Sequence, residues 1–186
     1  LESVGIVSGT EFAPDAFITR EQFAKWLLKN AGFIDEDYEM KKRKFIPDVM
    51  PKENPFAPYI YRLVDLGILE EKTGREKLMF EPRKKITRKE ALEWVFLVEG
   101  VSVPLIFDKN TFTATDVRLG SPNAPLTHRA IELGLVAPGK AKLNSSLKRG
   151  EAAHFLRAVK SSANMVTISF LPSSGSSLIT NPKYDV

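Results

Sequence analysis

The sequence predicts a mainly helical, all-α fold built from three repeats of a helix-loop-helix unit. In each repeat, a turn of glycine and two aliphatic residues is followed, after a loop, by a helix that opens with arginine. The turns are Gly5-Ile6-Val7, Gly67-Ile68-Leu69 and Gly134-Leu135-Val136, and the arginines are Arg20, Arg88 and Arg149. Such repetition is typical of folds in which each unit completes its core against its neighbours. Any binding site is therefore expected to occur three times.

The first helix of a unit is clearest in the second repeat, from about Tyr59 to Leu66. Its apolar residues recur every three or four positions, which is the spacing of one buried helical face. Gly67 follows this helix, as glycine commonly does just past a last turn. The third repeat copies the pattern, with Pro125 near the start of the helix and Gly134 after its end.

The second helix of a unit begins with a capping box in two of the three repeats. Thr19 is followed by Gln22 and Thr87 by Glu90. In this arrangement the two side chains satisfy two otherwise unpaired backbone N–H groups. The third repeat has Lys148 at the threonine position, so its cap must come from Ser146 or be missing. The loss of such a cap typically costs about 1 kcal/mol.

The repeats divide the chain into residues 1–34, which lack most of a leading helix, residues 45–100 and residues 108–162. Between them, residues 35–44 are highly charged and are expected to be solvated, whereas Gly100 to Asn110 is apolar and is expected to pack. Residues 163–186 are interpreted as a linker or the start of another domain. Met165 to Leu171 alternates as a short strand would.

Composition excludes several classes of site. The 186-residue chain has no cysteine, which rules out disulfides and thiolate chemistry. No stretch reaches the roughly 18 apolar residues of a membrane span. The net charge of +4 favours an anionic partner only weakly. The basic runs at 41–44 and 83–85 lack interleaved aromatic residues, so no nucleic-acid partner is predicted.

The three arginines stand where a cation is disfavoured, because a helix N-terminus carries about half a positive charge. With exposed N–H groups and a threonine hydroxyl beside it, an arginine there would form a compact anion site suited to a carboxylate. The predicted ligand-binding residues are Thr19, Arg20, Thr87, Arg88 and Arg149. The alternative is that each arginine pairs with a nearby acidic residue and holds the repeats together.

No other residues indicate catalysis or a bound metal. His128 and His154 are the two histidines of the chain and show no metal-ligand spacing. Trp26 and Trp94 occupy the same helical position in consecutive repeats and are interpreted as core residues rather than sugar platforms. There is no glycine-rich phosphate loop and no nucleophile elbow. The sequence predicts no enzyme activity and no cofactor.

The repeats resemble the S-layer homology domain. The resemblance rests on a phrase F-x-D-V, then Gly-Ile, a loop with F-x-P and finally I-T-R-x-E. The second repeat supplies Phe45, Asp48-Val49, Gly67-Ile68, Phe80-Glu81-Pro82 and Ile86-Thr87-Arg88-Lys89-Glu90. The first supplies Phe12-Ala13-Pro14 and Ile18-Thr19-Arg20, and the third supplies Phe112, Asp116-Val117, Gly134-Leu135 and Leu147 to Glu151. The third lacks F-x-P and has Leu143-Asn144-Ser145 in its approximate place.

The resemblance implies three modules packed as a pseudo-threefold helical spindle. It also implies grooves that hold cell-wall polysaccharide, often one that carries pyruvate, and that anchor surface proteins to the bacterial wall. The expected function is non-catalytic, extracellular anchoring through an anionic, carboxylate-bearing wall polysaccharide or peptidoglycan. Two alternatives stay open: a self-assembly module of a surface layer, and the accessory region of a wall enzyme.

Overall fold

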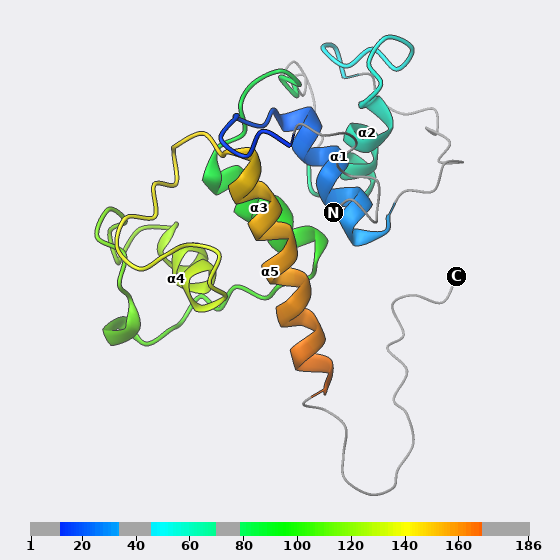
Figure 1. Ribbon diagram of the computed structural model, residues 1–186. Helices are drawn as coiled ribbons and strands as arrows, with labels where there is room; N and C mark the ends of the chain where they lie inside the picture. The colour runs from blue at the N-terminus through cyan, green and yellow to red at the C-terminus, as the bar shows by residue number, and fades with distance from the viewer. Residues whose placement is uncertain (1–11, 34–45, 70–78, 169–186) are drawn as a thin grey trace, which may run out of the picture.

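The computed structural model describes residues 12–33, 46–69 and 79–168, and this part of the chain is helical and contains no strand (Figure 1). The helices are α1 Arg20–Ala31, α2 Ala57–Asp65, α3 Arg88–Val98, the short 3-10 helix η1 Lys109–Thr111, α4 Ala124–Glu132 and α5 Arg149–Ile168. The predicted all-α class is therefore confirmed. The turn Gly5-Ile6-Val7 and the charged segment 35–44 lie outside the described residues.

The predicted starts of α1 and α3 are confirmed. Thr19 and Thr87 each cap their helix in a complete capping box, with Gln22 and Glu90 as the reciprocal partners. In α5 only half of the box forms, since the N–H of Lys148 donates to Glu151 at 3.0 Å. No hydroxyl caps α5 within the described residues, because lysine replaces the threonine.

The helices that open with arginine form the centre of the molecule. In the described part of the chain, α1, α3 and α5 contact one another in all three pairs (Figure 1). The apolar residue two positions before each arginine is fully buried; these residues are Ile18, Ile86 and Leu147. Trp26 and Trp94 are 4% and 5% exposed, so their predicted place in the core is confirmed.

The same three buried residues are joined by a closed ring of backbone hydrogen bonds. Ile18 donates to the carbonyl of Leu147 at 3.1 Å, Leu147 donates to Ile86 at 2.9 Å, and Ile86 donates to Ile18 at 3.2 Å. Each residue gives one bond and receives one, so the three segments are equivalent in these contacts. The ring satisfies backbone groups that burial would otherwise leave unpaired.

The first helix of one repeat packs on the second helix of the repeat before it. Thus α2 lies against α1, and α4 lies against α3. Proline near the start of α2 and α4 suits a first turn, where no N–H is needed. Gly67 and Gly134 follow these helices with φ of 70° and 68°, a conformation that favours glycine.

Two expectations for the connecting segments are wrong in part. No strand begins at Met165, because α5 continues to Ile168 and takes in the start of the region interpreted as a linker at 163–186. Short alternating apolar runs do not separate strand from helix reliably, and here an established helix continues through one. In the segment from Gly100 to Asn110, Val101 and Val103 pack on the core, but Leu105 and Ile106 are 85% and 92% exposed.

The caps lead to a stability prediction. Replacing Thr87 with alanine removes the hydroxyl that accepts the N–H of Glu90 at 3.2 Å. We expect Thr87→Ala to lower the free energy of unfolding by about 1 kcal/mol, measured by chemical denaturation. Thr87→Ser, which keeps the hydroxyl, is the control and is expected to lose less. Equal losses in the two variants would show that the cap is not the source of the effect.

Candidate functional site

Two aspartates at equivalent places each clamp a loop by its backbone. Asp48 accepts the N–H groups of Phe80 at 2.9 Å and Glu81 at 2.6 Å. The two residues belong to the loop that leads into α3, and Glu81 has φ of 54°. A carboxylate that accepts two adjacent N–H groups fixes this strained turn.

The third repeat builds the same clamp with Asp116. Its carboxylate accepts the N–H groups of Ala141 at 2.7 Å and Lys142 at 2.8 Å, and Lys142 has φ of 51°. These contacts make Ala141-Lys142-Leu143 the counterpart of Phe80-Glu81-Pro82. The expected counterpart, Leu143-Asn144-Ser145, is therefore displaced by two residues. The sequence motif does not reveal this register, because Ala141 replaces the aromatic residue of the F-x-P phrase.

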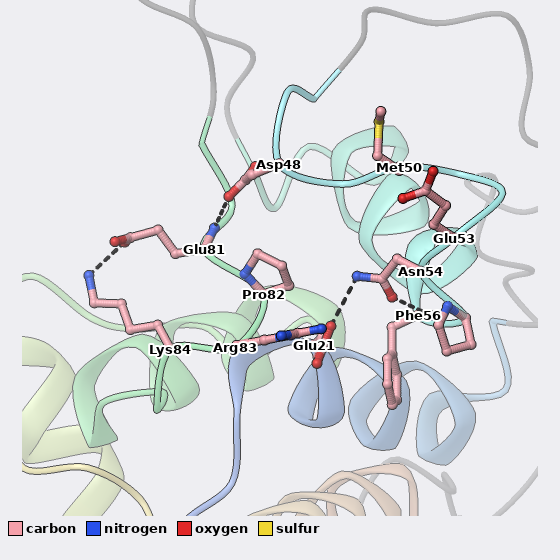
Figure 2. Close-up of a pocket in the computed structure, with 11 residues that line it drawn as sticks. Glu21, Asp48, Met50, Glu53, Asn54, Phe56, Glu81, Pro82, Arg83 and Lys84 are labelled. Carbon is pink, nitrogen blue, oxygen red and sulfur yellow. Dashed lines mark hydrogen bonds and ion pairs between the residues drawn. The ribbon is translucent and has the colours of Figure 1, made fainter.

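Beside the first clamp lies a cavity of about 730 Å³, the Asp48 pocket. It lies where the approach to α2 and the clamped loop meet the start of α1 (Figure 2). Asn54 joins these parts, since its amide donates to Glu21 of α1 at 3.0 Å. The lining residues are Glu21, Asp48, Met50, Glu53, Asn54, Pro55, Phe56, Glu81, Pro82, Arg83 and Lys84.

A second cavity of about 430 Å³, the Asp116 pocket, occupies the equivalent place in the third repeat. It is bounded by the approach to α4 and by the clamped loop before α5. Its lining residues are Asp116, Val117, Arg118, Ser121, Asn123, Lys142, Leu143, Asn144 and Ser145. Sequence reasoning missed both pockets, although it noted the aspartates as part of a motif.

Arg20 lies behind the clamped loop rather than in the Asp48 pocket. Its Nε donates to the carbonyl of Phe80 at 2.8 Å, and its guanidinium pairs with Glu90 of α3. The guanidinium carbon is 5.0 Å from the ring centre of Phe80 and 5.1 Å from that of Trp94. Only 11% of the Arg20 side chain is exposed.

Arg88 makes the equivalent polar contacts one repeat later, with Ala141 in the place of Phe80. It donates to the carbonyl of Ala141 at 3.2 Å and pairs with Glu151 of α5, and its side chain is 16% exposed. Burial lowers the pKa of Arg88, and the negative charge of nearby Asp116 opposes that shift. Both arginines thus form the ion pairs between repeats that the structural alternative predicted.

One glutamate therefore serves two purposes at each of these junctions. In Glu90, one carboxylate oxygen accepts the N–H and hydroxyl of Thr87, while the other pairs with Arg20. In Glu151, one oxygen accepts the N–H of Lys148 and the other pairs with Arg88. The carboxylate closes the cap of its own helix and also binds the arginine of the preceding repeat.

Arg149 lacks this partner because Gln22 stands at the glutamate position. The carbonyl oxygen of Gln22 accepts the N–H of Thr19 at 3.2 Å, and the remaining amide nitrogen can only donate. Arg149 lies over Trp26, with 5.4 Å between the guanidinium carbon and the ring centre. Within the described ranges it has no ion pair, and its buried Nε has no hydrogen-bond partner.

The helix starts are not open anion sites, and that part of the sequence interpretation is wrong. The N–H groups of Arg20, Arg88 and Arg149 donate to the carbonyls of Lys84, Ser145 and Ala16 at 2.8 to 2.9 Å. The next N–H in each helix also donates across the junction, to the carbonyls of Pro82, Leu143 and Pro14. The hydroxyls of Thr19 and Thr87 accept within their own helices. The backbone atoms expected to hold a ligand therefore hold the repeats together.

The clamp also affects ionisation. Desolvation alone would raise the pKa of Asp116, but the N–H groups of Lys142 and Ala141 stabilise the carboxylate and bring the net shift below the ordinary value. A lowered pKa means that the folded state favours the charged form. The clamp therefore contributes stability above the unfolded-state pKa and loses it as the pH falls through the folded-state pKa.

The histidines have structural surroundings. His128 is 5% exposed, lies 4.3 Å from the ring of Phe107, and shares a hydrogen bond of 2.8 Å with the hydroxyl of Thr111. His154 is exposed and contacts the carbonyl of Gly134. Across the described residues, no group of acidic or histidine side chains is arranged to hold a metal ion. In the same residues, no helix has the length and apolar character needed to cross a membrane.

Comparison with protein families gives one match. The family model described as S-layer homology domain matches residues 1–24 and 46–92, which include the starts of α1 and α3 and the Asp48 clamp. The comparison with curated proteins found no match.

The lack of an ion pair for Arg149 in the described ranges leads to a prediction. Gln22→Glu would keep an oxygen for the cap of α1 and supply a second oxygen for Arg149. We expect a gain of roughly 0.5 to 1 kcal/mol in the free energy of unfolding, as for a partly exposed ion pair. The gain should shrink as salt is raised in the denaturation experiment. A variant less stable than the wild type would contradict the assigned equivalence of Gln22 with Glu90.

The ion pair of Arg88 with Glu151 leads to the opposite prediction, a loss of unfolding free energy when the arginine is removed. Arg88→Ala would leave the partly buried carboxylate of Glu151 without its cation. The expected loss is roughly 1 to 3 kcal/mol of unfolding free energy, measured by calorimetry or denaturant titration. Arg88→Lys keeps the charge without the planar fork and should lose less. Unchanged stability in Arg88→Ala would mean that this ion pair does not hold α3 to α5.

Proposed function

Because residues 1–24 and 46–92 belong to the S-layer homology domain family, we propose that the chain binds an anionic cell-wall polysaccharide or peptidoglycan in the pockets beside its aspartate clamps. Domains of this family are non-catalytic anchors that hold proteins at a cell wall or surface layer. We further propose that the protein is located on the outer surface of a bacterial cell, where such a polymer is accessible.

One observation carries the proposal: the same cavity is built twice, beside the same aspartate clamp. Each pocket is open and is lined by polar and charged residues together with apolar ones, which are Met50, Pro55, Phe56 and Pro82 in the Asp48 pocket and Val117 and Leu143 in the Asp116 pocket. Sugars bind to such surfaces through hydroxyl groups and through their apolar faces. Two equivalent pockets on one chain suit a polymer, because linked sites raise its effective concentration.

A third module in residues 108–162 is part of the proposal. The family match ends at residue 92, so the support comes from backbone contacts. Leu147 takes the same part in the hydrogen-bond ring as Ile18 and Ile86, and Asp116 forms the same clamp as Asp48. A loop, a helix start and a pocket all correspond between the second and third repeats.

The residues predicted from the sequence to bind ligand have different parts in this proposal. Arg20 and Arg88 hold the carbonyls of the clamped loops, and Thr19 and Thr87 hold the helix starts; all four position the pockets from behind. Arg149 keeps a direct role, since its cation has no carboxylate partner in the described structure. Its place over Trp26 is the junction between the third and first repeats.

The proposal is tested by filling each pocket with a large side chain. Lys84 and Ser145 are equivalent, exposed lining residues, so Lys84→Trp and Ser145→Trp should obstruct the pockets without disturbing the core. We expect the double variant to lose most of its sedimentation with purified cell-wall sacculi while it keeps the wild-type melting temperature. Leu105→Trp, at an exposed site outside both pockets, is the control.

Two results would count against saccharide anchoring. Full sedimentation of the double variant would separate wall binding from the pockets. Failure of free wall polysaccharide to displace the wild-type protein would favour contacts between protein copies, because sugar should not disrupt a protein lattice.

A further inference from the structure

The two pockets are built on the same backbone but carry different side chains at matching positions. The clamps align Asp48 with Asp116, and the helix starts align Ala57 with Ala124. From these anchors the matching pairs are Met50 with Arg118, Asn54 with Ser121, Glu81 with Lys142, Arg83 with Asn144, and Lys84 with Ser145. A difference in ligand preference must therefore come from these side chains.

The Asp48 pocket is acidic in balance. Four of its lining residues are carboxylates and two are cations. One of the cations, Lys84, is already paired with Glu81 at 2.6 Å. Glu21, which borders the pocket, has Lys89 at its equivalent place in α3. A carboxylate-bearing sugar would meet net repulsion here.

The Asp116 pocket is basic in balance. It is lined by Arg118 and Lys142 with Asp116 as its one carboxylate. That carboxylate is committed to two backbone N–H groups. Arg118 and Lys142 are exposed and have no ion-pair partner within the described residues. Lys140 lies near enough to act on Asp116 electrostatically and adds to the positive field.

An unused polar group lies in the same pocket. The hydroxyl oxygen of Ser121 is buried and has no hydrogen-bond partner in the described structure. At the matching position in the Asp48 pocket, the side chain of Asn54 donates to Glu21 at 3.0 Å and accepts the N–H of Phe56 at 2.7 Å. The two pockets therefore also differ at this position in whether the side chain is committed to hydrogen bonds within the protein.

We propose that the Asp116 pocket takes the carboxylate-bearing units of the saccharide, with Arg118 and Lys142 as the cations that recognise them, and that the Asp48 pocket takes neutral units. This rests on the proposed saccharide function and assigns the acidic specificity to one of its two pockets. Arginine matches the two oxygens of a carboxylate, and lysine adds a mobile point charge. The start of α4 borders the Asp116 pocket just as the start of α2 borders the Asp48 pocket. The helix starts therefore do not account for the difference in charge between the pockets.

The test uses isotope-labelled protein and two small probes, methyl glucuronide and methyl glucoside, followed by backbone amide chemical shifts. We expect the glucuronide to shift residues 116–123 and 142–145 more strongly than the glucoside, and to bind more weakly as salt is raised. The Arg118→Gln, Lys142→Gln double variant should weaken glucuronide binding roughly three- to tenfold and leave glucoside binding unchanged.

The converse experiment moves the two cations to the Asp48 pocket. Met50→Arg with Glu81→Lys places the same two cations in the Asp48 pocket. The residue at 81 already has the left-handed backbone that Lys142 adopts, so the exchange adds no new backbone strain. This variant is expected to gain glucuronide-dependent shifts at residues 48–56 and 81–84 that the wild type lacks.

The outcomes separate the two proposals. Glucuronide shifts centred on residues 48–84 in the wild type, no glucuronide shifts at residues 116–145, or no effect of the Arg118→Gln, Lys142→Gln pair would overturn the assignment to the Asp116 pocket. Loss of sacculus binding by the pocket-filling variants would still support the anchoring function in that case. Wild-type protein that fails to bind sacculi but shows the expected glucuronide shifts would overturn the anchoring function alone.

Discussion

The ring of three backbone hydrogen bonds at Ile18, Ile86 and Leu147 is the constraint on which the other contacts depend. It brings the starts of α1, α3 and α5 together, so each helix start faces the loop of another repeat. Two further N–H groups of each helix then donate to that loop. The same geometry places the aspartate clamps and the pockets beside them at the junctions. Glu21 of the first repeat also lines the Asp48 pocket, whereas the residues that line the Asp116 pocket all lie in the third repeat.

The arginine motif serves assembly at two junctions and differs at the third. Glu90 and Glu151 each close a cap and neutralise the arginine of the preceding repeat. Replacing a carboxylate with the amide of Gln22 keeps the cap and removes the neutralising charge. The pockets differ in a comparable way, since Glu81 and Lys142 share a backbone position but carry opposite charges. Repeats that are equivalent in backbone are thus distinct in electrostatics.

Local patterns predicted the helices and their limits, but contacts between repeats were harder to predict. The capping boxes, Gly67 and the buried tryptophans followed from spacing and residue type, whose effects act within a few residues. Pairing of Arg20 with Glu90 depends on the packing of segments distant in sequence, which spacing alone does not determine. Arg149 has no carboxylate partner among the described residues, and Gln22 in the capping box is the sequence feature that corresponds to this difference. The strand predicted at Met165 failed because a short apolar run fits either secondary structure.

The most direct measurement is an experimental structure of the protein with an oligosaccharide released from the cell wall. We expect saccharide in the cavities beside Asp48 and Asp116, an acidic group in contact with Arg118 or Lys142, and Arg20 and Arg88 still paired with Glu90 and Glu151. Saccharide bound directly to Arg20 and Arg88, with those ion pairs broken and both cavities empty, would contradict this expectation.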